Sequence, residues 1–242
     1  MRARGGVLEP TIFAIVGIAI LCGLGLWQLD RKIWKENLIA AMTERIARPP
    51  TDLPSRDRWG SLLSEREEFA RVGFPAEFLE GQEALVYSAG SALRPDVQGP
   101  GYWVFSPARL AGGSIVIINR GFVPLDRKDV ASRGAPHGSV DIVGIVRWPE
   151  TRGMFTPADE PQNNVWYLRD IAAIAAAKKW AAAAPFYIDQ EAPVPLGGWP
   201  KSGKLQVNLP NNHLQYAITW FGLALALAGV YLVWLIRRLR HF

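Results

Sequence analysis

The segment Leu214–Ile236 reads LQYAITWFGLALALAGVYLVWLI, 23 residues without a charged side chain. A second apolar segment, Thr11–Leu29, reads TIFAIVGIAILCGLGLWQL and holds 19 residues without a charge. At about 1.5 Å per residue, helices of these lengths extend over roughly 34 and 28 Å, enough for the hydrocarbon core of a bilayer, which is about 30 Å thick. The two segments therefore predict transmembrane helices near the two ends of the chain.

The residues between these segments predict one domain on one side of a membrane. The first helix is expected to continue beyond the membrane over 30–48, where apolar residues recur at helical spacing up to Pro49 and Pro50. We expect a tail over 1–10, a first transmembrane helix over 11–29, a domain over 30–213 with a linker at 49–54, a second transmembrane helix over 214–236 and a basic tail over 237–242.

Charge is unevenly distributed and indicates an orientation. The chain has 27 Lys and Arg and 22 Asp and Glu; its two ends hold Arg2, Arg4, Arg237, Arg238 and Arg240 against Glu9, which leaves 22 basic and 21 acidic residues between the apolar segments. This balance argues against a nucleic-acid surface. A long loop is translocated largely regardless of its charge, so the basic residues at the two short ends determine the orientation of the chain in the membrane. We predict a two-pass protein of the bacterial inner (cell) membrane with both termini cytoplasmic and a periplasmic loop.

The middle of the chain predicts short strands and one clear helix. Asp170 is a good N-cap for an alanine-rich helix over Ile171–Ala184, ended by Pro185. Ala111, Gly112 and Gly113 indicate a hairpin turn. The fold class is therefore a membrane-anchored α+β protein with a β-rich, antiparallel domain. The expected strands are Phe69–Phe74, Ala84–Ser88, Tyr102–Leu110, Ser114–Asn119, Val140–Trp148 and Phe186–Asp189.

Several kinds of chemistry are excluded by missing residues and motifs. The single cysteine, Cys22, lies in the first apolar segment, so the domain has neither disulfides nor thiolate metal sites. No Walker loop, GxGxxG, GxSxG or HExxH motif is present. With no catalytic group of polar residues, the sequence predicts a protein that is not an enzyme.

One of the three histidines stands out by its position. His213 opens the second apolar segment, whereas His137 falls in a predicted turn and His241 in the terminal tail. Asn212 is a good N-cap, with Gln215 at the N3 position of a capping box. His213 then lies in the first helical turn, where the positive end of the helix dipole disfavours an imidazolium. We expect a neutral ring, which is the form that binds metal ions.

Both apolar segments reach the same membrane surface because the chain forms a hairpin. One interpretation of the residues there is an interfacial aromatic belt with a snorkelling arginine. The other is a haem site, in which His213 is the axial ligand of the haem iron, aromatic side chains pack on the macrocycle and Arg31 meets a propionate. The residue pattern leaves both open. The residues expected near His213 are Trp27, Gln28, Arg31, Tyr216 and Trp220.

Three motifs are specific enough to suggest a family. Gly25–Arg31 reads GLWQLDR and resembles the pattern G-x-W-Q-x-x-R; Asn119–Pro124 reads NRGFVP and resembles N-R-G-W-V-P, with Phe122 in place of the usual tryptophan. Asn211–Trp220 reads NNHLQYAITW and resembles N-x-H-L-Q-Y-x-x-T-W. These patterns are those of the Surfeit-locus family of cytochrome c oxidase assembly factors, and the chain is identified as a bacterial member.

The resemblance implies a role in maturing the haem-containing catalytic subunit of cytochrome c oxidase. It implies a haem chaperone that binds or hands over haem a through His213, with oxidase subunit I, and possibly haem a synthase, as partners in the lipid membrane. A scaffold that stabilises the immature subunit without binding haem is the alternative. The central motif has no assigned chemistry; we expect a strand end there, with Arg120 in a salt bridge and Gly121 releasing backbone strain.

Overall fold

The computed structural model describes residues 6–91, 93–130, 138–180, 183–195 and 197–240. It divides into two compact units. The helix unit comprises Met1–Ala41 and Leu209–Phe242, and the domain comprises Met42–Asn208. The predicted turn at His137 and the tail residue His241 lie outside the described residues, as do Arg2 and Arg4.

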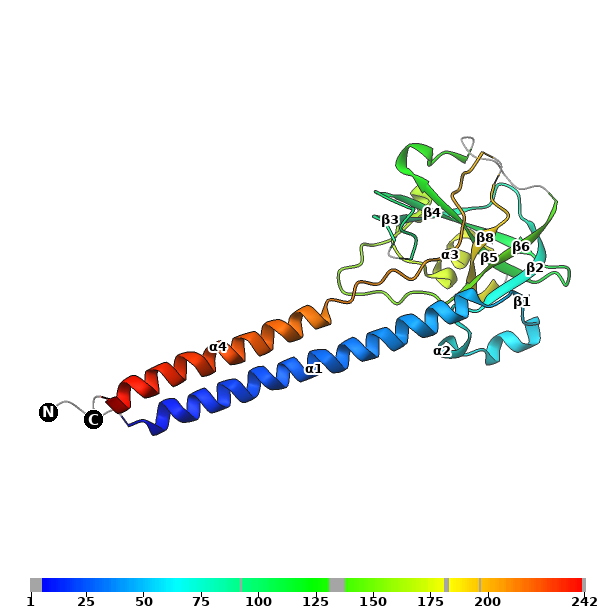
Figure 1. Cartoon of the computed structure of the whole chain (residues 1–242). Coiled ribbons are helices and arrows are strands. Elements are labelled where there is room, and N and C mark those ends of the chain that lie inside the picture. The colour runs from blue at the N-terminus through cyan, green and yellow to red at the C-terminus, as the bar shows by residue number, and fades with distance from the viewer. Residues whose placement is uncertain (1–5, 92, 131–137, 181–182, 196, 241–242) are drawn as a thin grey trace. The chain divides into compact units, whose positions relative to one another are not determined.

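The helix unit consists of two long antiparallel helices that lie side by side (Figure 1). Helix α1 spans Leu8–Ala47 and helix α4 spans His213–Arg240, and both are long and apolar enough to cross a membrane. As predicted, α1 continues without a break beyond its apolar part. The end helices of the expected fold class are thereby confirmed, and they fit a two-pass membrane protein.

Small residues let the two helices approach closely. A Cβ atom on Gly25 would lie 2.6 Å from Cζ of Phe221, and one on Gly17 would lie 2.9 Å from a methyl group of Leu227. At the far end of the pair, the hydroxyl groups of Thr11 and Tyr231 are 2.6 Å apart. Packing of this kind is how helices associate where no hydrophobic effect drives them together.

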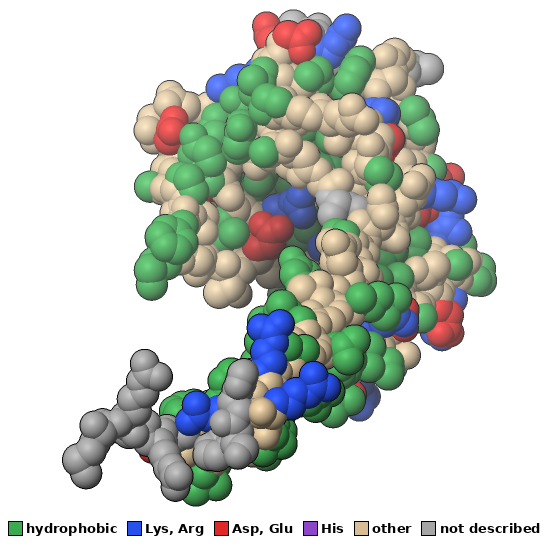
Figure 2. Space-filling view, turned by 60° about the vertical axis from the view of Figure 1, so that its left-hand side comes forward, with side chains coloured by type: hydrophobic (Ala, Val, Ile, Leu, Met, Phe, Trp, Pro, Cys, Tyr) green, Lys and Arg blue, Asp and Glu red, His purple; other side chains and the backbone are tan. Residues whose placement is uncertain are grey.

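The outer faces of both helices are apolar. Figure 2 shows Lys and Arg side chains gathered near the chain ends on this helix pair, where α4 ends with Arg237, Arg238 and Arg240. Basic side chains beyond an apolar span are typical of the cytoplasmic side of a membrane. Among the most exposed side chains of the two helices are Leu8, Phe13, Ile15, Ile218, Leu225 and Val230.

The domain is built on a ring of five strands. Strands β2, β6, β8, β5 and β4 follow one another, and β2 also pairs with β4, so the sheet closes on itself. Strands β3 and β7 continue outward from β4, and β1 lies at the opposite edge beside β2. The strands are β1 (Thr51–Asp52), β2 (Arg71–Phe78), β3 (Ala84–Ser88), β4 (Gly101–Arg109), β5 (Ile115–Pro124), β6 (Ser139–Arg147), β7 (Val165–Trp166) and β8 (Ala183–Ala192).

The prediction of a β-rich domain is confirmed, and its main pairings are antiparallel. The hairpin turn at Ala111–Gly113 joins β4 to β5, with Gly113 at φ 79°. Strands β5 and β8, however, pair in parallel, with Ile117 beside Tyr187. The short helical segments are η1 (Arg56–Ser61), α2 (Ser64–Glu67), η2 (Leu125–Arg127), η4 (Pro161–Asn163) and α3 (Ile171–Lys178).

Alternate residues of β5 and β8 contribute to two different apolar cores of the domain, and a smaller third cluster lies around Val104. Ile118 and Phe186 belong to the first core, to which all five ring strands contribute and in which Trp59 of η1 meets Phe186 edge-on. Ile117 and Tyr187 belong to the second core, which is covered by α3. Both faces of β5 and β8 are buried over Ile115–Ile118 and Phe186–Ile188, and these stretches are continuously apolar. Buried polar residues follow in each strand, beginning at Asn119 and Asp189.

Two local predictions are wrong in part. Asp170 caps α3 as expected, accepting a hydrogen bond from the N–H of Ala173 at 3.0 Å, but the helix ends at Lys178 instead of Ala184. Lys179 takes a left-handed conformation, and Ala183 joins β8 beside Ile115. The expected linker at 49–54 contains β1, because its backbone pairs with Val72 and Gly73 of β2.

Candidate functional site

His213 is the first residue of α4, and it is hydrogen-bonded to α1. Its Nδ1 atom lies 2.7 Å from Oε1 of Gln28. An amide oxygen only accepts hydrogen bonds, so Nδ1 of the imidazole carries the proton. In the neutral ring, Nε2 then keeps its lone pair and is the atom available to a metal. The contact with Gln28 therefore sets the tautomer of His213 and leaves Nε2 as the electron-pair donor of the ring.

The start of α4 is held in place by the residues before His213. The backbone N–H of Tyr216 donates to the carbonyl of Asn212, so Asn212 occupies the expected cap position. The side-chain amide of Asn211 donates to the carbonyl of Lys32 at 3.4 Å. This contact was not predicted, although Asn211 belongs to the same motif. It joins the start of α4 to α1 one helical turn beyond Gln28.

The other predicted site residues surround this contact more loosely. Trp27 is 53% exposed and Tyr216 is 56% exposed, whereas Trp220 is half-buried. The guanidinium carbon of Arg31 lies 4.1 Å from the ring centroid of Trp34. Among the residues that the structure describes, no ring contact joins Trp27, Tyr216 and Trp220. Of the six predicted residues, the structure thus brings Gln28 and His213 into direct contact.

A single histidine such as His213 suits a metal ion that is already bound by a macrocycle and needs only one ligand from the protein. In the described part of the chain, no group of three or more His, Cys, Asp or Glu side chains could hold a bare metal ion. A single imidazole is nevertheless sufficient for haem, whose iron is already bound by four macrocycle nitrogens. The residues of the helix unit therefore fit haem at the ligand atom.

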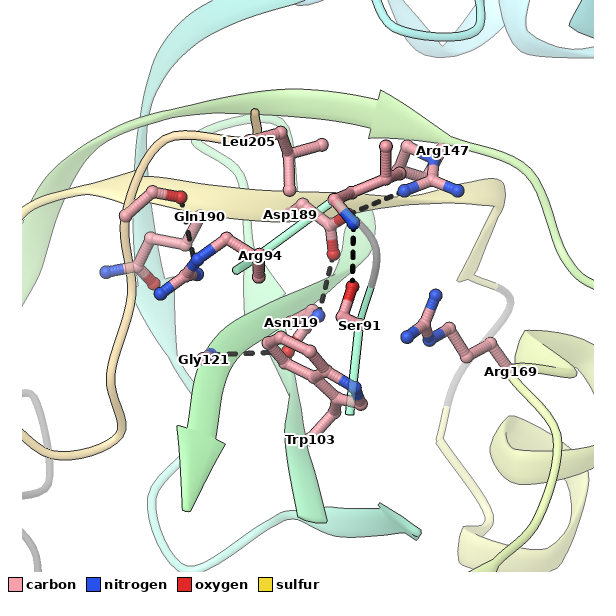
Figure 3. A pocket seen from close by; sticks show the side chains of 12 residues that line it. Ser91, Arg94, Trp103, Asn119, Gly121, Arg147, Arg169, Asp189, Gln190 and Leu205 are labelled. Carbon is pink, nitrogen blue, oxygen red and sulfur yellow. Dashed lines mark hydrogen bonds and ion pairs between the residues drawn. The ribbon is translucent and has the colours of Figure 1, made fainter. Parts of the chain in front are cut away.

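A second polar site is a small cavity inside the domain (Figure 3). Figure 3 shows a chain of hydrogen bonds in which Asp189 is central. One carboxylate oxygen of Asp189 accepts from Nδ2 of Asn119 at 2.7 Å, and the other accepts from Nη1 of Arg147 at 3.0 Å. The Asn119 side chain in turn accepts from the N–H of Gly121. Three strands, β5, β6 and β8, are tied together in this way.

The charges around the cavity are balanced. Arg147 pairs with Asp189, Arg94 with Asp96 and Arg169 with Glu150. Burial, reinforced by the charge of Asp189, raises the pKa of the Tyr187 hydroxyl to about 12. Burial opposes the charge of Arg147, but nearby Tyr187, Asp189 and Glu68 raise the pKa of its guanidinium overall.

The cavity is too small for a cofactor. Its volume is about 10 Å³, roughly the space that one water molecule needs. The indole Nε1 of Trp103, which lines the cavity, is buried without a hydrogen-bond partner among the described residues. We therefore interpret the cavity as the centre of a structural polar network.

The central motif of the sequence belongs to this network. Asn119 and Gly121 lie within β5 instead of at its end, and Gly121 has φ 130°. A Cβ atom on Gly121 would lie 2.4 Å from the backbone of Lys201, so only glycine fits. Arg120 is buried, with its guanidinium carbon 5.5 Å from the ring centroid of Phe78, and Phe122 packs edge-on against Trp103.

The fold and site define a class: a chain with a closed β-barrel domain between two long apolar helices in the sequence, with a hydrogen-bonded histidine opening the second helix. A family model described as the SURF1 family matches residues 15–225. The chain belongs to the SURF1 family, which is known for cytochrome oxidase assembly factors and is not an enzyme class. The family resemblance of the sequence motifs is thus confirmed.

Several relatives match most of the chain. A SURF1-like protein of Monosiga brevicollis is 34% identical over 233 residues, which are 91% of this chain and 85% of that protein. Surfeit locus protein 1 of Mus musculus is 32% identical over 238 residues, covering 93% and 76% of the two chains. The protein of that name from Homo sapiens is 34% identical over 214 residues, covering 84% and 70%.

Proposed function

We propose that this chain matures cytochrome c oxidase by binding haem a, or handing it over, with His213 as the axial ligand. The observation that carries the proposal is the 2.7 Å hydrogen bond between Nδ1 of His213 and Oε1 of Gln28. It leaves Nε2 free as an electron-pair donor and holds the ring in one orientation. Haem a, when bound, supplies the iron that this nitrogen would ligate.

The remaining predicted residues receive supporting roles in this proposal. Trp27, Tyr216 and Trp220 offer apolar ring surface to the macrocycle, and Arg31 offers a cation to a propionate. More than half of the surface of Trp27 and of Tyr216 is open for such packing. The chain acts on haem delivery and not as an enzyme.

The proposed setting is a bacterial inner membrane. Both termini lie in the cytoplasm and the β-barrel domain lies in the periplasm, in agreement with the basic residues that end α4. The proposed partners are subunit I of cytochrome c oxidase, which receives the haem, and haem a synthase, which makes it. Membrane lipid surrounds the two helices.

A scaffold that stabilises the immature oxidase subunit without haem is the second candidate. It is favoured by the exposure of Trp27 and Tyr216, because exposed aromatic residues at a membrane surface serve equally well as an interfacial belt. In that case the bond between Gln28 and His213 would simply join the two helices.

The two candidate functions predict different Soret absorbance when wild type is compared with His213→Ala. Wild type and His213→Ala are purified from cells that make haem a, and their Soret absorbance is compared at equal protein concentration. Haem binding predicts loss of most of the Soret band, because alanine removes the axial bond yet favours the helix. Full haem with an unchanged spectrum in His213→Ala would exclude His213 as the ligand.

A further inference from the structure

Two neighbouring apolar side chains of the domain project almost completely from its surface. Met154 is 92% exposed and Phe155 is 93% exposed. The next most exposed large apolar side chains in the described part of the domain are Val194 at 63% and Leu63 at 52%. Exposure of a phenylalanine beside a methionine is unfavourable in water and calls for an apolar environment that covers them.

The segment that carries these side chains is an ordered turn. The N–H of Thr156 donates to the carbonyl of Gly153 at 3.2 Å, and the N–H of Gly153 donates to Oγ1 of Thr156 at 3.0 Å. Met154 and Phe155 are the two central residues of this turn. Its geometry therefore turns both side chains away from the polar groups that close it.

The base of the turn is tied to the rest of the domain. Arg152 donates to the carbonyl of Pro157 at 2.6 Å and pairs with the carboxylate of Asp159. The same carboxylate accepts a hydrogen bond from the N–H of Tyr167, just after β7, at 2.8 Å. A turn held in this way keeps Met154 and Phe155 at a defined place on the domain.

We propose that this turn, the Met154–Phe155 tip, inserts into the surface of the lipid bilayer. The same chain carries two helices long and apolar enough to cross a bilayer, so a membrane is a surface to which this protein is attached by its own helices. Between Gly153 and Pro157 the segment has no charge. Aromatic and long apolar side chains with an uncharged backbone turn are well suited to the membrane interface.

The small size of the tip favours lipid over a protein partner. A stable protein interface covers about 800 Å² on each partner. Two side chains at the end of a turn supply only a part of that area, whereas a bilayer accepts a single apolar tip without a matching surface. This proposal is independent of haem binding at His213, and either can fail without the other.

The test measures whether the tip touches lipid in the full-length protein. In a Cys22→Ala background, an environment-sensitive fluorophore is attached to Met154→Cys, which leaves Phe155 in place. The protein is reconstituted in lipid nanodiscs with and without nitroxide-labelled lipids. We expect blue-shifted emission that the labelled lipids quench several-fold more strongly than that of a fluorophore on Ser139→Cys, an exposed position at the start of β6.

A charge at the tip provides the second arm. Phe155→Asp should reduce the lipid quenching at position 154 to the level of the Ser139 control, whereas Val194→Asp, which changes another exposed apolar residue, should leave it high. Thermal melting checks that each variant is folded. Equal quenching at positions 154 and 139 would overturn the proposal. So would emission that shifts only when oxidase subunit I is added, which would assign the tip to a protein interface.

Discussion

The helix pair and the β-barrel domain differ in how they accommodate buried polar side chains. In the helix unit, the helices approach closely at Gly17 and Gly25, and isolated polar contacts such as that of Gln28 with His213 lie among apolar residues. In the domain, a chain of charged and amide side chains is buried between three strands. Polar side chains therefore mark a candidate ligand site in the helix unit and provide structural support in the domain.

The largest expected effect lies in the buried network. Asp189→Ala removes the carboxylate that pairs with Arg147 and leaves a buried guanidinium without that partner. We expect the free energy of unfolding of the domain to fall by about 3–5 kcal/mol. Denaturant unfolding in detergent, followed by tryptophan fluorescence, measures this change. Asp141→Ala, at an exposed position of β6, is the control and should change little.

The second prediction concerns the polar contact of the helix pair. If Gln28 sets the tautomer of His213, Gln28→Leu should weaken haem binding by about 10–100-fold, as loss of a hydrogen bond to a metal-ligating histidine typically does. Haem titration of the purified protein measures the affinity. Gln215→Leu alters an exposed glutamine of α4 and should retain haem. Unchanged affinity in Gln28→Leu would reduce the contact to simple helix packing.

Substitution of Gly25 should disrupt the close packing of the helices, whereas the same substitution at Gly23 should not. Gly25→Ile places a branched side chain against the ring of Phe221, at a cost of about 1–3 kcal/mol, whereas a Cβ on Gly23 has no neighbour within 4 Å. The yield of a Thr11→Cys to Tyr231→Cys crosslink in a Cys22→Ala background reports helix pairing. It should fall in Gly25→Ile and persist in Gly23→Ile; equal yields would show that this approach is dispensable.

A single helix cap gives a smaller effect in the domain. Asp170→Ala removes the acceptor for the N–H of Ala173 at the start of α3. The free energy of unfolding should fall by about 1 kcal/mol, because one helical N–H loses its partner. Urea unfolding measures it, and Asp170→Asn, which retains a capping oxygen, should lose much less. A loss as large as that of Asp189→Ala would mean that α3 supports the second core more than its cap alone indicates.

The smallest effect is a pH dependence at the domain surface. The hydrogen bonds from Arg94 lower the pKa of the Asp96 carboxyl from 3.8 to about 2. The ionised carboxylate therefore stabilises the domain above about pH 4, and this stabilisation is lost as the pH falls toward 2. Because Asp96 is partly exposed, the contribution should stay below about 1 kcal/mol. Thermal melting from pH 2 to 5 should show a shallower slope for Asp96→Asn than for wild type.

The sequence by itself determined the local elements of this protein. Uncharged runs of 19 and 23 residues predicted the two helices, and β3 was predicted with its observed bounds, Ala84–Ser88. The cap at Asp170 and the glycine turn before β5 were also predictable from the sequence. Each depends on neighbouring residues, whose spacing and side chains act over one or two turns of backbone. The three motifs likewise indicated the family, because each is an unbroken stretch of sequence that can be compared directly with the pattern of the family.

Only the tertiary structure decided which distant segments meet. The closure of β2 on β4, the parallel pairing of β5 with β8 and the contact of Arg147 with Asp189 join residues far apart in the chain, and no local pattern encodes the choice. Helix α3 ends early because Ala183 gains a strand partner in β5. The predicted hairpin places Gln28 and His213 at the same membrane depth, but their 2.7 Å hydrogen bond depends on how closely α1 and α4 pack. Such contacts follow from packing and long-range backbone pairing, which outweigh local preference where a strand or helix can bury its surface.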